Sequence, residues 1–147
     1  MRRIAGYSLW LGHVDDAVDV TGLHANGISA VVDLAGNELP IVLPREVTYC
    51  RFPLIDGPGN PIWLLRAAID TVAHLARNGV ATLVYCSAGL SRSPCIAAAA
   101  LAQIRHCTVA EALPLVIESR RCDVSPGLLS DMQRALTIDS HSTPHPG

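Results

Sequence analysis

One stretch of the sequence decides the fold, Val80-Ala-Thr-Leu-Val-Tyr-Cys86-Ser-Ala-Gly-Leu-Ser-Arg92-Ser93. Its apolar first part, Val80–Tyr85, predicts a buried strand, and the alanine-rich segment Pro94–Arg105 that follows predicts a helix packed inside the protein. The connection contains small residues and Gly89, which permits a turn where a Cβ atom would clash. A loop of this kind points backbone N–H groups at one spot, with the positive end of the helix dipole behind them. The stretch therefore predicts an anion-binding loop.

The rest of the chain alternates between strand-like and helix-like segments. Further strands are predicted at 7–11, 28–35 and 47–54, and further helices at 14–26, 62–78, 109–119 and from 126 to about 138. Strands separated by helices imply an α/β fold, with a mostly parallel sheet of four to five strands covered by helices on both faces. In such sheets the functional groups collect beyond the carboxyl ends of the strands.

Cys86 follows the predicted strand directly and is the candidate nucleophile. A helix N-terminus with an arginine beside it favours the thiolate form of a cysteine, which is the nucleophilic form. The guanidinium of Arg92 can hold phosphate oxygens through two parallel hydrogen bonds, and the loop backbone adds further donors. The pattern predicts a phosphatase site. Its phosphate-binding residues would be Ser87, Ala88, Gly89, Leu90, Ser91 and Arg92.

Cleavage of a phosphate ester also needs a proton donor for the leaving oxygen. Asp56 is the candidate acid, because it follows the strand at 47–54 in a Gly/Pro-rich loop that can bring it over the phosphate. An aspartate before glycine is also a common turn signal, so a purely structural role stays open. Asp33 is the second candidate acid, although fixing a neighbouring loop suits it better. Ser93 can donate a hydrogen bond to the departing sulfur, cap the helix, or do both.

Length and composition exclude several other classes of protein. The 147 residues are half hydrophobic and 16% charged, which predicts one domain over 1–139 and a disordered tail over 140–147. The net charge of −2 argues against a nucleic-acid partner. The chain has 11 arginines and no lysine, which excludes Schiff-base chemistry and a Walker-type phosphate loop. The histidines show no metal-ligand spacing, so we expect no metal and no cofactor.

The number of cysteines indicates the cellular compartment in which we expect the protein. There are five of them, an odd number, and we find no signal peptide before them. The longest apolar stretch, Cys95–Ala102, has eight residues and cannot span a bilayer. We therefore expect a cytoplasmic protein with reduced thiols and no membrane partner. A reversible disulfide between Cys50 and Cys86 under oxidation is a further hypothesis.

Taken together, these residues resemble the dual-specificity branch of the cysteine-dependent protein tyrosine phosphatases. The resemblance covers nearly the whole chain and is carried most specifically by Ala88-Gly-Leu-Ser-Arg-Ser93 and by Phe52-Pro-Leu-Ile-Asp56, whose aspartate precedes Cys86 by 30 residues. It implies a three-layer α/β/α fold, no metal and a phosphocysteine intermediate. It also implies Cys86 as nucleophile, Arg92 as phosphate ligand, Asp56 as acid and then base, and Ser93 as the helper for thiolate departure.

One position departs from that family's pattern. The family usually has a histidine immediately before the nucleophile, and here that residue is Tyr85. The histidine helps to organise the loop and to stabilise the thiolate, whereas tyrosine cannot become cationic. We therefore expect a less stabilised Cys86 thiolate and a shifted pH optimum.

The expected function is hydrolysis of phosphotyrosine, and of phosphoserine or phosphothreonine, in phosphorylated proteins or peptides. Alternatives are a phosphoinositide or RNA 5′-phosphate hydrolase of the same family, a phosphate-binding pseudophosphatase module, and a sulfurtransferase or arsenate reductase with a similar cradle. Positions 87–91 contain no Lys or Arg to neutralise extra phosphates, which argues against phosphoinositides. A pseudophosphatase would usually lack Cys86, Arg92 or Asp56, and all three are present.

Overall fold

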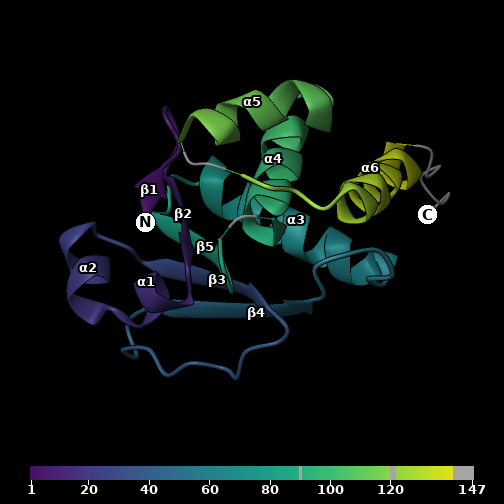
Figure 1. Ribbon diagram of the computed structural model, residues 1–147. Helices are drawn as coiled ribbons and strands as arrows, with labels where there is room; N and C mark the ends of the chain where they lie inside the picture. Colours follow the sequence, from purple (N-terminus) through teal and green to yellow (C-terminus); the bar gives the residue numbers. More distant parts are fainter. Residues whose placement is uncertain (90, 120–121, 141–147) are drawn as a thin grey trace, which may run out of the picture.

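The computed structural model describes residues 1–89, 91–119 and 122–140, and at its centre lies one five-stranded sheet (Figure 1). The strand order is β1-β2-β5-β3-β4. The pairs β2–β5, β5–β3 and β3–β4 are parallel, and the pair β1–β2 is antiparallel. The mostly parallel sheet expected from the sequence is therefore confirmed. The strands are β1 (Arg2–Arg3), β2 (Leu9–His13), β3 (Ala30–Ala35), β4 (Thr48–Leu54) and β5 (Thr82–Cys86).

Helices cover both faces of the sheet, which gives three layers. In Figure 1, α1 and α2 lie on one side and α3 to α6 lie on the other. Side chains alternate between the two faces along each strand. Leu83 and Tyr85 of β5 pack in the cluster that includes Leu23 of α2, whereas Val84 and Cys86 pack in the larger cluster under α3 and α4. The helices are α1 (Val14–Val18), α2 (Val20–Ala25), α3 (Ile62–Arg77), α4 (Arg92–Arg105), α5 (Val109–Ser119) and α6 (Pro126–Ser140).

Three elements differ from the sequence prediction. The helix expected at 14–26 is two helices, because Asp19 interrupts it and caps α2 by accepting a hydrogen bond from the Gly22 N–H at 3.1 Å. Strand β1 was not predicted. Helix α4 begins at Arg92 rather than at Pro94, because a proline within the first turn displaces no intrahelical hydrogen bond. Of the expected tail, Ser140 closes α6, and residues 141–147 lie outside the described residues.

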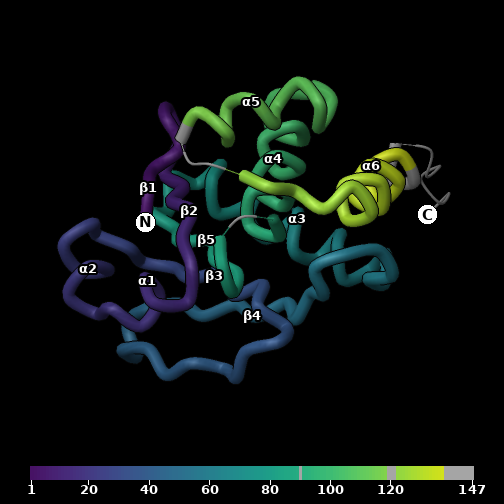
Figure 2. Tube along the Cα trace, in the orientation of Figure 1, coloured from purple at the N-terminus to yellow at the C-terminus, as the bar shows by residue number. Residues whose placement is uncertain are grey.

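The sheet topology brings three connections to one edge. The Cys86 loop (residues 86–92) follows β5, the Asp56 loop (residues 55–61) follows β4, and the β3–β4 connection (residues 36–47) runs as an open loop in the Cα trace of Figure 2. All three leave the carboxyl ends of neighbouring parallel strands. In the part of the chain that the structure describes, no helix combines the length and the apolar character needed to cross a membrane.

Candidate active site

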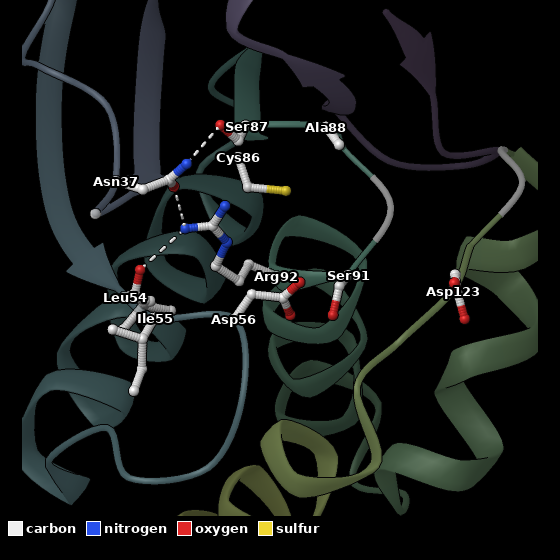
Figure 3. Close-up of a pocket in the computed structure, with 11 residues that line it drawn as sticks. Asn37, Leu54, Ile55, Asp56, Cys86, Ser87, Ala88, Ser91, Arg92 and Asp123 are labelled. Carbon is white, nitrogen blue, oxygen red and sulfur yellow. Dashed lines mark hydrogen bonds between the residues drawn. The ribbon is translucent and has the colours of Figure 1, made fainter.

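A pocket of about 530 Å³ opens at this edge of the sheet (Figure 3). The Cys86 loop, the Asp56 loop and the β3–β4 connection each contribute to its wall, and so does the segment before α6. Its lining therefore joins residues that are far apart in the sequence. The lining residues are Gly36, Asn37, Leu54, Ile55, Asp56, Cys86, Ser87, Ala88, Ser91, Arg92 and Asp123.

Cys86 is the last residue of β5 and is 2% exposed. Its Sγ atom lies 3.3 Å from the Oγ atom of Ser93, which is buried in the first turn of α4. That distance allows the hydroxyl to donate to the sulfur. The loop between them turns at Gly89, whose φ of +73° belongs to the left-handed region that favours glycine. Leu90, one of the predicted phosphate-binding residues, lies outside the described residues.

Arg92 is 6% exposed, and its guanidinium is fixed from one side. The Nη1 atom donates to Asn37 Oδ1 at 2.8 Å and to the Leu54 carbonyl oxygen at 3.0 Å. The Nε atom is buried and has no hydrogen-bond partner among the described residues. A buried donor without an acceptor is costly, and an oxyanion in the pocket would supply that acceptor. The unpaired Nε–H group can therefore donate to a phosphate oxygen, which agrees with the phosphate-binding role predicted for Arg92 from the sequence.

Asp56 lies in the same pocket, in an exposed part of its loop. In Figure 3 its carboxylate points toward the first turn of α4, where Ser91 and Arg92 lie. An electrostatic effect agrees with this placement. Burial raises the pKa of Cys95, in the same turn of α4, to about 12, and the negative charge of Asp56 adds to the shift. The Asp56 carboxyl group is thus close to the end of α4 that faces the pocket.

The Asp56 loop is braced from within and from α6. Asn60 accepts a hydrogen bond from the Ile55 N–H at 2.9 Å and donates to the Ile55 carbonyl oxygen at 3.0 Å. Asp131 of α6 accepts one from the Gly59 N–H at 2.9 Å. Gly127 lies so close that a Cβ atom on it would come within 2.7 Å of the Pro58 ring. These contacts fix the position of the loop that carries Asp56.

Asp33, the second candidate acid, does not line the pocket. Its carboxylate is fully buried and accepts hydrogen bonds from the Ala35 N–H at 2.8 Å, from Arg51 Nη1 at 2.9 Å and from the Tyr49 hydroxyl. Arg51 in turn donates to the Glu38 carbonyl oxygen at 2.9 Å. Asp33 therefore ties the end of β3 to β4, which is the loop-fixing role, and it is not placed to act as the acid.

The comparison with known proteins agrees with this geometry. The family model described as "Dual specificity phosphatase, catalytic domain" matches residues 9–133. The chain belongs to the dual specificity phosphatase family. Human Dual specificity protein phosphatase 14 is 32% identical over 148 residues, a match that covers 94% of this chain and 74% of that protein. This chain is accordingly a hydrolase of the protein phosphatase class.

Solved structures give the same result for the fold of this dual specificity phosphatase. The crystal structure of human DUSP28 has a TM-score of 0.83 at 27% identity, and the match covers 97% of this chain and 100% of that chain. The crystal structure of PTPMT1 in complex with PI(5)P has a TM-score of 0.71 at 17% identity, covering 92% and 94% of the two chains. The second match shows a shared fold alone.

Tyr85, the residue before Cys86 in this phosphatase, is fully buried and lies opposite Asp33 in the register of β3 and β5. Burial raises the pKa of its hydroxyl strongly, and the nearby Asp33 carboxylate and Tyr49 hydroxyl raise it further. Tyr85 is therefore a neutral phenol at neutral pH. It brings no positive charge next to Cys86.

A Tyr85→His variant is expected to gain reactivity at Cys86. A histidine facing Asp33 is stabilised as the imidazolium, whose charge favours the neighbouring thiolate. Iodoacetamide should alkylate Cys86 about three to ten times faster than in wild type at pH 6. Tyr85→Phe, which removes the hydroxyl and keeps the ring, should alkylate at the wild-type rate. Equal rates for Tyr85→His and wild type, in a variant with unchanged thermal unfolding, would contradict the expectation.

The sheet register excludes the direct disulfide between Cys50 and Cys86. Cys50 pairs with Val32 of β3, and Val32 pairs with Val84 of β5, so that β3 lies between the two cysteine-bearing strands. Two strand spacings of about 4.8 Å exceed the roughly 7 Å between Cα atoms that a disulfide tolerates. All five cysteines are free in the structure.

Several pocket residues were not predicted from the sequence. Asn37 and Asp123 line the pocket, and Glu38 contacts it through Ser87. The sequence did contain a signal for Asn37. This residue lies two residues beyond the carboxyl end of β3, and functional groups collect at that end of the strands in such sheets. No comparable signal marks Asp123, which reaches the pocket from the segment between α5 and α6.

Proposed function

We propose that this dual specificity phosphatase hydrolyses phosphotyrosine, and phosphoserine or phosphothreonine, in phosphorylated proteins or peptides through a phosphocysteine intermediate. The observation that carries the proposal is the meeting of three groups in one pocket. Cys86, Arg92 and Asp56 all line it, the first two from the connection after β5 and the third from the connection after β4. They supply a nucleophile, a cationic phosphate ligand and a proton donor.

In the first step the Cys86 sulfur attacks the phosphorus atom of the bound phosphate ester. The bond between phosphorus and the ester oxygen breaks, and Asp56 gives its proton to that oxygen. Arg92 and the backbone of residues 87–91 hold the three other oxygens and stabilise the charge that they carry in the transition state. The products are the free alcohol or phenol of the substrate and a phosphocysteine at position 86.

In the second step a water molecule attacks the same phosphorus atom. Asp56, now a carboxylate, takes a proton from the water, and the bond between sulfur and phosphorus breaks. Ser93, at 3.3 Å from the sulfur, donates a hydrogen bond to the departing thiolate. Inorganic phosphate leaves, and the resting state returns. The scheme requires no metal or cofactor, because Cys86 is the nucleophile and Arg92 supplies the positive charge.

The charges around the pocket favour a phosphoprotein over a phosphoinositide or an RNA. Among the described lining residues Arg92 is the basic side chain, and Asp56 and Asp123 carry carboxyl groups. A phosphoinositide or RNA strand carries further phosphates, which would meet carboxylates rather than cations. We therefore propose a phosphorylated protein or peptide as substrate and no nucleic-acid or membrane partner. The five free cysteines support a cytoplasmic location as a further part of the proposal.

A substrate panel tests the proposal. Purified protein would be given one peptide sequence carrying phosphotyrosine, phosphoserine or phosphothreonine, phosphoinositide vesicles, and a 5′-phosphorylated RNA. We expect at least one of the peptides to be dephosphorylated about tenfold faster than the lipid or the RNA. Acid quenching during turnover should trap phosphate on the peptide that contains Cys86, as seen by mass spectrometry. Faster turnover of the lipid or RNA would select that alternative, and no turnover of any substrate would indicate a phosphate-binding module.

A further inference from the structure

The Arg92 guanidinium is oriented by a chain of hydrogen bonds that leaves the pocket. Its Nη1 atom donates to Asn37 Oδ1 at 2.8 Å. The Asn37 Nδ2 atom donates to Ser87 Oγ at 3.0 Å, and the Ser87 hydroxyl donates to Glu38 Oε1 at 2.5 Å. Figure 3 shows Asn37 between Arg92 and Ser87, with its amide in contact with both. This chain of hydrogen bonds links the Cys86 loop to the β3–β4 connection.

Every hydrogen bond in this chain runs in the same direction. It begins at a cation, passes through a neutral amide and a hydroxyl, and ends at the Glu38 carboxylate. Bonds aligned in this way polarise and strengthen one another. The alignment also determines how the Asn37 amide is turned. The Ser87 hydroxyl donates its one proton to Glu38, so it can only accept a hydrogen bond from the Asn37 amide NH₂ group. The Asn37 carbonyl oxygen must therefore face Arg92.

The neutrality of Asn37 matters for the phosphate. Nη1 is held by Asn37 and by the carbonyl oxygens of Leu54 and, at 3.5 Å, Leu34, which are all acceptors without net charge. The positive charge of Arg92 is thus not neutralised by a carboxylate on this nitrogen. The Nε atom, buried and without a partner among the described residues, stays available. A bidentate contact with phosphate requires a defined orientation of the guanidinium plane, and the hydrogen bonds of Nη1 set that orientation.

We propose that Asn37 is a positioning residue that orients Arg92 for phosphate, and that Glu38 fixes the Asn37 amide through Ser87. The proposal rests on the proposed function, in which Arg92 binds the phosphate of the substrate. Asn37 acts through Arg92 and does not itself react. Asn37 is exposed at the rim of the pocket, so its replacement opens no cavity in the core.

The test compares Asn37→Ala and Asn37→Asp with wild type. Removal of one hydrogen bond to a charged group should weaken inhibition by orthovanadate and raise KM for an aryl phosphate by about tenfold, with a smaller change in kcat. In Asn37→Asp the new carboxylate competes with phosphate for Arg92, so the loss at neutral pH should be larger. That loss should shrink as the pH falls and the new carboxyl is protonated, whereas the ratio of Asn37→Ala to wild type should stay constant with pH.

Two further variants serve as controls. Asn78→Ala removes an exposed asparagine that donates to the His74 carbonyl oxygen at the end of α3, and its KM and vanadate inhibition should equal wild type. Glu38→Gln should raise KM by about threefold, because Ser87 then donates to a neutral acceptor. Wild-type vanadate inhibition in Asn37→Ala, or a ratio of Asn37→Asp to wild type that does not change with pH, would overturn the proposal.

A binding measurement separates this proposal from the proposed function. Isothermal titration calorimetry with orthovanadate reports the affinity of the pocket without turnover. If wild type binds orthovanadate and hydrolyses none of the substrates, the proposed function fails, while a weaker affinity in Asn37→Ala still supports the positioning role. If wild type hydrolyses its substrates and Asn37→Ala binds orthovanadate with wild-type affinity, the proposed function stands and the positioning role fails.

Discussion

Replacement of Cys86 by serine is expected to lower kcat on an aryl phosphate by at least about a thousandfold, because a serine hydroxyl in the same place is not ionised and is a much weaker nucleophile than a thiolate. The change replaces one buried atom that packs under α4. The fold should therefore survive, and orthovanadate should still bind through Arg92. Initial rates of aryl phosphate hydrolysis measure the first expectation, and thermal unfolding checks the second.

A second cysteine provides the matched control. Cys107 is half-buried beyond the end of α4 and does not line the pocket, so Cys107→Ser should keep the wild-type rate. Equal hydrolysis by wild type and Cys86→Ser would remove Cys86 as the nucleophile. Loss of activity in both serine variants would point instead to a general sensitivity of the fold to cysteine replacement.

Replacement of Asp56 by asparagine is expected to slow the reaction by an amount that depends on the leaving group. A general acid contributes about a hundredfold to ten-thousandfold when the leaving oxygen is a poor one and must be protonated. For phenyl phosphate we expect a loss of about a hundredfold or more, and for dinitrophenyl phosphate a loss below about tenfold. The measurement is a plot of log kcat/KM against the pKa of the leaving phenol, which should be steeper in the variant.

The control for Asp56 is another exposed aspartate. Asp70 lies on α3, where it pairs with Arg66 at 3.2 Å, and Asp70→Asn should leave the plot unchanged. A loss in Asp56→Asn that is the same for every leaving group would show that Asp56 has a structural role in its loop. The acid would then have to be sought among the other pocket residues, of which Asp123 is the remaining carboxyl group described.

Most of the fold could be predicted because its signals are local. The apolar run before Cys86 becomes β5, and the capping pattern at Thr108 and Glu111 opens α5, where the Thr108 hydroxyl accepts from the Glu111 N–H at 3.1 Å. Strand β1 could not be predicted, because Arg2 and Arg3 have no strand pattern and become a strand through pairing with β2. Its existence depends on pairing with β2, which lies only a few residues further along, and not on a strand pattern of its own.

The residues of the candidate site also divide into those that could be predicted from the sequence and those that could not. Cys86, Arg92 and Ser93 lie within one loop and helix start, so their spacing in the sequence was enough to associate them. Asn37 and Asp123 enter the pocket from other connections, and only the order of the strands brings them there. The roles of Cys86, Arg92, Ser93, Asp56 and the backbone of residues 87–91 remain predictions, of which the Cys86 and Asp56 variants above test two.

The bracing of the Asp56 loop has a consequence for the timing of the reaction. Asn60 and Asp131 hold the loop through hydrogen bonds, and Gly127 lies against Pro58. In many enzymes whose catalytic acid lies on a mobile loop, the movement of that loop limits the rate of turnover. Because these contacts hold the Asp56 loop at the pocket, we expect the rate of catalysis to be set by the making and breaking of bonds at phosphorus.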